Sequence, residues 1–175
     1  SPPHIFTTSQ LHNFTTSLHM SHLIVLQEPD DRLRRLSEEI DVSTITSPNM
    51  QKFIVDLKET MKLEDGIGIA APQVGITERI IIVDLPDRGP SAFFNPVITE
   101  RSFKMIDSTE GCLSVPECSG IVKRHRGVTV RVWNEKREEE IIKVVDLSAI
   151  VFQHEIDHLD GVLFIDRAEK IKKYR

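Results

Sequence analysis

The amino-acid sequence predicts an α+β fold whose strands pair in antiparallel fashion. One observation supports this class, and two more indicate a single domain. Several short apolar strands follow one another between two helices, instead of alternating with helices one by one. The 175 residues suffice for one hydrophobic core but are too few for two domains that each have a core of their own. No internal repeat or low-complexity linker divides the chain.

Local patterns predict each element in order. A short helix is expected near residues 31–39. A longer helix over 50–63 follows, because Phe53, Leu57 and Met61 fall at helical spacing. The run Ile-Ile-Ile-Val-Asp-Leu after Arg79 is mostly apolar and predicts a buried strand. The predicted strands are 79–85, 92–99, 120–123, 127–134 and 140–145, and a last helix spans 148–159.

That last helix carries a His-Glu-x-x-His motif at residues 154–158. Two histidines four residues apart in a helix point to the same side, because four residues make about one turn. Ile150 and Val151 share this side, and Ser148 is a candidate N-cap. The motif therefore predicts a metal ion between the histidines, with Glu155 reaching a water on that ion. The alternative is a buried helix whose histidines only satisfy hydrogen bonds.

The third ligand distinguishes among metal hydrolases. In metzincin-type proteases the motif continues to Gly-x-x-His, but Phe164 stands where that histidine should be. The residues after His158 leave little room for a second helix with a carboxylate ligand. Cys112 is therefore the best candidate to join His154 and His158, which leaves the fourth position open for catalysis. A thiolate ligand admits Fe(II) as well as zinc.

The sequence holds two cysteines, Cys112 and Cys118, six residues apart. We do not expect a disulfide between them, since nothing in the sequence indicates an oxidising compartment. Cys118 is expected to be an ordinary thiol near the start of a strand.

A glycine-rich segment at residues 66–75 superficially matches a dinucleotide-binding fingerprint. That fingerprint needs a strand before it and a helix after it, whereas here a helix comes first and a strand follows. We therefore reject nucleotide binding. Gly66 and Gly68 instead let the backbone of a ligand approach closely. The amide of Gln73 offers an N–H to a developing negative charge.

Three motifs together resemble the signature motifs of the peptide deformylases, in the order of that family. They are Gly-x-Gly-x-Ala-Ala-Pro-Gln-x-Gly at 66–75, Glu-Gly-Cys-Leu-Ser at 110–114 and Gln-His-Glu-x-Asp-His at 153–158. The resemblance extends over about residues 24–164, and the segment 29–34 also resembles the N-terminal part of the family. It implies that small antiparallel sheets surround a central metal-binding helix.

The resemblance implies removal of the N-formyl group from the formyl-methionine that begins new polypeptides, with release of formate. A metal held by Cys112, His154 and His158 would acidify its bound water and polarise the formyl oxygen. Glu155 would take the proton of the water and return it to the leaving amine. The Gln73 amide and the backbone N–H of Leu113 would stabilise the oxyanion. In this family Fe(II) is often the native ion, with zinc, nickel or cobalt as substitutes.

Substrate recognition is expected beside the metal. Ile150 and Val151 lie one turn before His154, so they could line an apolar pocket that suits a methionine side chain, or belong to the core. By resemblance, Ile67, Glu110 and Gly111 help to form this pocket, and the backbone of Gly68 pairs with the extended peptide. Many bacterial members carry an arginine where this chain has Ser119, which leaves the preference beyond methionine open.

Bulk properties favour a single catalytic domain over residues 20–175. Residues 1–19 contain no Asp, Glu, Lys or Arg and are expected to form an extension outside this domain. They lack the features of a secretory signal, so a cytoplasmic location is expected, with an organellar one as the alternative. No apolar run is long enough for a membrane span.

The charge balance argues against general nucleic-acid binding. Lys and Arg number 22 against 27 Asp and Glu, which gives a net charge of −5, and we expect no DNA partner. The basic residues 123–126 are interpreted as a solvated strand end, with a transient ribosome contact as the secondary hypothesis.

Two other functions would use the same histidine helix. A zinc-dependent endopeptidase shares the glutamate, but Phe164 and the upstream Cys112 count against it. A structural zinc module would need a fourth protein ligand and would have no use for Glu155. The sequence therefore favours a deformylase.

Overall fold

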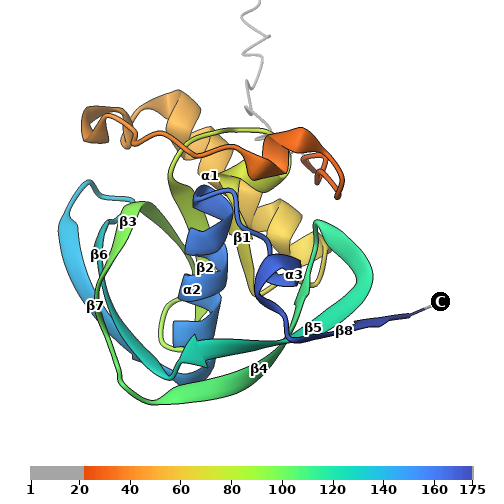
Figure 1. The fold of residues 1–175 in the computed structure, drawn as a ribbon. Helices are drawn as coiled ribbons and strands as arrows, with labels where there is room; N and C mark the ends of the chain where they lie inside the picture. Colours follow the sequence, from red (N-terminus) through yellow and green to blue (C-terminus); the bar gives the residue numbers. More distant parts are fainter. Residues whose placement is uncertain (1–21, 175) are drawn as a thin grey trace, which may run out of the picture.

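The computed structural model describes residues 22–174, so the predicted extension at residues 1–19 lies outside the described residues. The described chain combines helices with two antiparallel sheets, which confirms the α+β prediction (Figure 1). The helical elements are η1 (Asp31–Arg34), η2 (Val42–Thr44), α1 (Pro48–Leu63), η3 (Ala71–Val74), α2 (Asp146–Leu159) and α3 (Phe164–Arg167). The strands are β1 (Gly68–Ala70), β2 (Ile80–Leu85), β3 (Gly89–Arg101), β4 (Met105–Cys112), β5 (Val115–His125), β6 (Gly127–Trp133), β7 (Glu139–Val145) and β8 (Lys170–Lys173).

The two sheets enclose the helix α2. The larger sheet has the strand order β1-β2-β3-β6-β7, and the smaller has the order β4-β5-β8. All pairings between these named strands are antiparallel. Helix α2 packs against β1, β2 and β7 of the larger sheet and against β5 of the smaller one, and it stands at the centre of Figure 1. The expected arrangement of small sheets around a central helix is therefore confirmed.

Strand β2 separates two parts of the hydrophobic core. Ile81 and Val83 face the cluster that contains α2, whereas Ile80 and Ile82 face the cluster that contains α1. Both faces of this strand are covered along residues 80–83, which explains the apolar run there, whereas Asp84 near the end of the strand is exposed. On the α2 side, Phe152 packs against a phenylalanine of β3 with 5.2 Å between ring centroids. The histidine helix is thus held by its apolar face.

The helix expected at residues 31–39 is wrong in length, because only the 3-10 turn η1 forms. The backbone N–H of Ser37 donates to the carbonyl of Leu159 at 2.8 Å, and that of Glu38 donates to Thr77 at 3.0 Å. These groups bond to distant segments and are unavailable for a longer helix.

Helix α2, which carries the two histidines, starts at Asp146, two residues before the predicted N-cap Ser148. Its N-cap residue is Val145, which makes no side-chain capping bond. Instead, the backbone N–H of Asp146 donates to the carbonyl of Arg126 at 2.7 Å. A contact with a neighbouring strand end therefore sets this boundary, and local sequence does not reveal it.

Six elements were not predicted: η2, β1, η3, β4, α3 and β8. Strand β4 lacks the apolar alternation of a half-buried strand because Ser108 and Glu110 occupy buried positions on its inner face. Strand β1 comprises three residues of the glycine-rich segment, and β8 is exposed along its length. Short and polar strands carry too weak a pattern for recognition from sequence.

Candidate metal centre and active site

Helix α2 presents both histidines of the motif to the same place. His154 and His158 lie one turn apart, with 5.1 Å between ring centroids and their planes at 68°. His158 and Glu155 are almost completely buried, at 1% and 4% exposure. A buried helix with neighbours on both sides holds these side chains in defined rotamers.

Cys112 joins the two histidines from the end of strand β4. Its Sγ lies 3.2 Å from Nε2 of His158. One ligand atom from each of Cys112, His154 and His158 lies within 4.8 Å of the others. One sulfur and two imidazole nitrogens converging in this way suit a borderline divalent ion such as zinc or Fe(II). Cys112 and Cys118 are both free thiols, in agreement with the expectation.

A cavity of about 370 Å³ opens directly beside this cluster. Its volume falls in the range of small-molecule sites, roughly 300–1,000 Å³. All the residues that were predicted to bind substrate border this cavity, and so do all the predicted catalytic residues. Two of the three predicted metal ligands border it as well. The bordering residues with predicted roles are Ile67, Gly68, Gln73, Glu110, Gly111, Cys112, Leu113, Ile150, Val151, His154 and Glu155.

Glu155 occupies a buried position at the cavity, and its Oε2 has no hydrogen-bond partner among the described residues. Burial raises the pKa of this carboxyl to about 7, although a charge on His154 opposes the shift. A carboxyl with this pKa can both accept and donate a proton near neutral pH.

Gly68 is pressed against this glutamate. A Cβ at Gly68 would overlap Oε1 of Glu155 and would lie 2.7 Å from Cγ1 of Val151. Glycine is therefore required here to leave room for the carboxylate. The sequence analysis favoured the approach of a ligand's backbone at this glycine, which remains a prediction.

The amide of Gln73 is held in a fixed orientation by the short helix η3. Its Oε1 accepts a hydrogen bond from the backbone N–H of Ala70 at 2.8 Å. Its Nε2 then points to Sγ of Cys112 at 3.6 Å and to Oγ of Ser114 at 3.2 Å. The donor end of the amide is consequently directed to the side of the cavity where Cys112 lies.

Glu110 borders the cavity, but its carboxylate is bonded to other side chains. It accepts from Nε and Nη2 of Arg124 at 2.8 and 2.9 Å, and from Nδ1 of His154 at 2.9 Å. Burial would raise the pKa of Glu110, but the bonds from Arg124 and His154 outweigh it and lower the pKa to about 2. The carboxylate thus stays ionised and orients the ring of His154.

The two histidines differ in their electrostatic surroundings. Burial lowers the pKa of His154, but the bonds with Cys112 and Glu110 outweigh this effect and raise it to about 10. Burial, with a charge on His154, lowers the pKa of His158 well below its usual value. Because a ligating imidazole must be unprotonated at the metal, binding an ion would displace a proton from His154.

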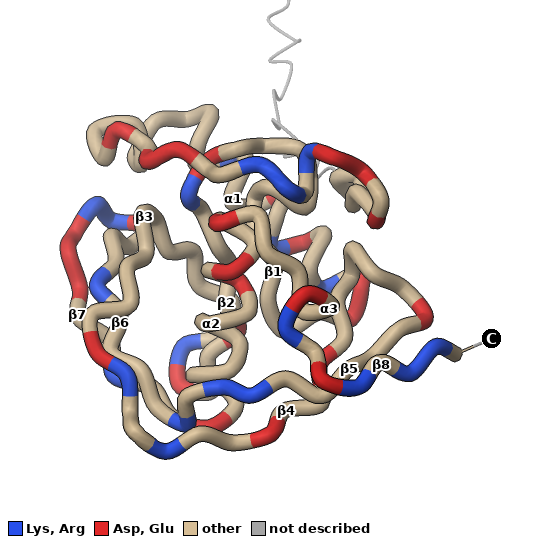
Figure 2. The backbone as a smooth tube through the Cα atoms, in the orientation of Figure 1, with Lys and Arg blue, Asp and Glu red and all other residues tan. Residues whose placement is uncertain are grey.

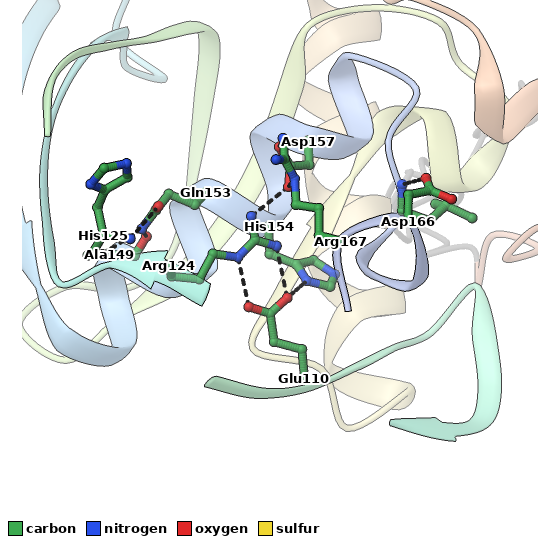
Figure 3. Close-up of polar contacts among 10 residues, drawn as sticks. Glu110, Arg124, His125, Ala149, Gln153, His154, Asp157, Asp166 and Arg167 are labelled. Atoms are coloured by element: carbon green, nitrogen blue, oxygen red, sulfur yellow. Dashed lines mark hydrogen bonds and ion pairs between the residues drawn. The ribbon is translucent and has the colours of Figure 1, made fainter. Parts of the chain in front are cut away.

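Sequence reasoning missed the charged residues that lie behind the cluster of Cys112, His154 and His158. Arg124 was interpreted as part of a solvated strand end, and this is wrong, because its side chain is only 4% exposed. It bonds to Glu110 and to Asp157, and Arg167 joins the same group (Figure 3). The alternation along β5 could have indicated this, since Arg124 shares a strand face with the buried Val122.

Gln153 was also missed. Its side chain accepts from the backbone N–H of His125 at 3.0 Å and donates to the carbonyls of His125 and Ala149 at 2.8 and 2.9 Å (Figure 3). These bonds join the residue before His154 to the end of β5. No local pattern indicates such a role for a glutamine.

The fold and the Cys-His-His cluster define a metal-dependent hydrolase with a histidine helix at its centre. The sequence model described as Polypeptide deformylase matches residues 22–174. This chain belongs to the polypeptide deformylase family, whose members bind a single metal ion and remove the N-formyl group from nascent polypeptides. The comparisons give no support to the endopeptidase alternative.

Individual relatives agree over most of their length. The peptide deformylase of Desulforudis audaxviator is 40% identical over 149 residues, 85% of this chain and 95% of the relative. Peptide deformylase 1 of Clostridium acetobutylicum is 45% identical over 141 residues, 79% and 89% of the two chains.

Solved structures of peptide deformylases superpose on the fold. The Synechococcus elongatus structure in complex with actinonin has a TM-score of 0.79 and 36% identity, covering 85% of this chain and 79% of the other. The Acinetobacter baumannii structure with bound Met-Ala-Ser has a TM-score of 0.80 and 32% identity, with coverages of 85% and 99%.

Proposed function

We propose that this chain hydrolyses the N-formyl group of formyl-methionyl polypeptides at the cavity beside Cys112, His154 and His158, releasing formate. The observation that carries the proposal is the convergence of these three donors, within 4.8 Å of one another, at a cavity that Glu155 and Gln73 also border. The match over residues 22–174 supports treating residues 20–175 as one catalytic domain.

The three donors would hold one divalent ion, with Fe(II) as the native ion and zinc, nickel or cobalt as substitutes. An ion in this site supplies Lewis acidity, which makes a water more acidic and polarises the formyl carbonyl. A thiolate and two imidazoles fit this role, because three protein ligands would leave one position of a four-coordinate ion for water or substrate.

Glu155 acts as general base and then as general acid. Its carboxylate accepts a proton from the attacking water and later delivers it to the nitrogen of the leaving amine. Burial raises the pKa of this carboxyl above its usual value, toward neutral pH, and this favours both transfers. The unpartnered Oε2 is available to receive that proton.

Gln73 and Leu113 stabilise the negative charge that develops on the formyl oxygen. The acceptor end of the Gln73 amide is already bonded to Ala70, which leaves Nε2 as the donor beside Cys112. The backbone N–H of Leu113 directly follows the thiolate in the chain and supplies the second donor. Donors that are fixed before the reaction need no reorganisation when charge develops.

Replacing Gln73 with methionine should remove this donor while keeping the side-chain length. The expected result is a fall in kcat of about 10²–10³-fold, the usual effect of losing one oxyanion donor. Steady-state kinetics with a formyl-methionyl peptide measures it, with metal content and thermal unfolding as controls because Ala70 loses its acceptor. A fall below threefold would remove Gln73 from the oxyanion site.

The methionine side chain occupies the apolar part of the cavity. Ile150 and Val151 form its wall, and Ile67 stands at its rim with 48% exposure. The backbone near Gly68, Glu110 and Gly111 borders the path of the peptide. The Met-Ala-Ser peptide in the Acinetobacter baumannii structure supports a cavity suited to a chain that begins with methionine.

A transient contact with the ribosome and a cytoplasmic location fit a substrate that is a nascent chain. Of the basic residues 123–126, Lys123 and Arg126 are exposed, and each pairs with an aspartate. Acidic and basic residues are interspersed along the described backbone (Figure 2).

In residues 22–174 no helix has the length and apolarity to cross a membrane.

The experiment that tests the function is formate release from formyl-Met-Ala-Ser by anaerobically prepared protein, with metal content determined on the same sample. We expect formate in proportion to bound metal. An unformylated internal peptide should remain uncleaved. Full metal occupancy without formate would overturn the proposal.

A further inference from the structure

A continuous series of ion pairs runs from Arg167 in helix α3 to a proposed metal ligand (Figure 3). Arg167 donates to Asp157 from Nε and Nη2, at 2.7 Å to Oδ2 and 2.8 Å to Oδ1. Arg124 donates from Nη1 to the same Oδ2 at 2.6 Å. Its Nε and Nη2 reach Glu110, whose Oε2 accepts from Nδ1 of His154 at 2.9 Å.

Burial increases along this series toward the metal site. The side chain of Arg167 is 48% exposed, that of Asp157 is 12% exposed, and those of Arg124 and Glu110 are each 4% exposed. The two arginines balance the two carboxylates in charge. Both oxygens of each carboxylate accept hydrogen bonds, so these side chains form one hydrogen-bonded network.

Helix α3 also contacts the metal site through a second residue. Phe164, three residues before Arg167, stacks near His154 with 6.3 Å between ring centroids and 21° between planes. This helix lies close to β5, since a Cβ at Gly120 would lie 2.7 Å from Cβ of Ala168. Helix α3 therefore contacts the ring of His154 directly through Phe164, and it is linked to that ring indirectly through the series of ion pairs that begins at Arg167.

We propose that Arg167 is a positioning residue for the metal site, acting through Asp157, Arg124 and Glu110 on His154. Its planar fork fixes both oxygens of Asp157, which holds the guanidinium of Arg124 and hence the carboxylate that orients the His154 ring. The inference rests on the proposed use of His154 as a metal ligand. It assigns a role in orienting the metal site to a half-exposed side chain that does not itself belong to the three donors.

The test compares Co(II) binding by the metal-depleted full-length protein and its variants, by chelator competition and by the absorption spectrum of the bound ion. Arg167→Ala should weaken Co(II) binding about tenfold, the lower end of the effect of losing outer-sphere support. Its Co(II) spectrum should also shift, because the ring of His154 is reoriented. Arg167→Lys, which restores charge without the fork, should recover part of the affinity.

Arg131→Ala is the matched control. Arg131 is similarly exposed (46%), and it pairs with Glu139 in the larger sheet instead of with the series of ion pairs. It should leave both the affinity and the spectrum unchanged. Wild-type affinity and spectrum in Arg167→Ala would overturn the inference, even if that variant unfolded at a lower temperature. If the wild-type protein itself bound no Co(II) through a thiolate, the metal site of the proposed function would fail, and the inference with it.

Discussion

Replacing Glu155 with glutamine is expected to lower kcat for formate release by about 10²–10⁴-fold while the protein keeps its metal. Glutamine has nearly the same shape but cannot accept the proton of the attacking water. Because Glu155 is not one of the three clustered donors, the site for the ion remains complete. Rates from formate release and metal content from the same preparation measure the two effects separately.

Glu139→Gln serves as the control for this variant, since Glu139 is an exposed glutamate of β7 paired with Arg131. It should turn over formyl-Met-Ala-Ser at the wild-type rate. Near-normal activity in Glu155→Gln would exclude Glu155 as the general base. Loss of metal together with activity would instead give Glu155 a role in retaining the ion.

A single methyl group at Gly68 is expected to cost about 10²-fold in kcat/KM, because displacing a catalytic group by about 1 Å has effects of that size. The Cβ of Gly68→Ala would overlap Oε1 of Glu155 and press on Val151. Both neighbours are buried, so the carboxylate must move away from its position at the cavity. Metal content should be unchanged, since no clustered donor is touched.

A double-mutant cycle separates this steric effect from a role in peptide binding. If Gly68→Ala acts by displacing the carboxylate, it should add little to the loss already caused by Glu155→Gln. If Gly68 instead contributes by pairing with the peptide, its effect should be retained in full in the double variant. Circular dichroism and thermal unfolding of all three variants check that the fold is intact.

The helix with the histidines could be predicted because its pattern is local. Helix geometry alone brings residues four apart to one side, so the shared direction of His154 and His158 follows from their spacing. The buried strand β2 was equally evident, since both of its faces are covered along residues 80–83 and these residues are all apolar. Even so, the first residue of α2 was misplaced, because a bond from Asp146 to Arg126 sets it.

Glu110 illustrates what local patterns omit. By resemblance it was expected at the substrate pocket, and it does border the cavity. Its carboxylate, however, is engaged by Arg124 and His154, which come from a different strand and from α2. The polar inner face of β4 that results is also the reason why this strand was not predicted.

The class of fold, the histidine helix and the three motifs of the family can be read from the amino-acid sequence, because each depends on residues close together in the chain. Other features appear only in the folded protein: Cys112 lies 3.2 Å from His158, and Gly68 makes room for Glu155. The link from Arg167 to His154 is another, and it runs through Asp157, Arg124 and Glu110. These contacts join segments whose separation in sequence bears no fixed relation to their distance in space. Only the packing of both sheets around α2 brings them together.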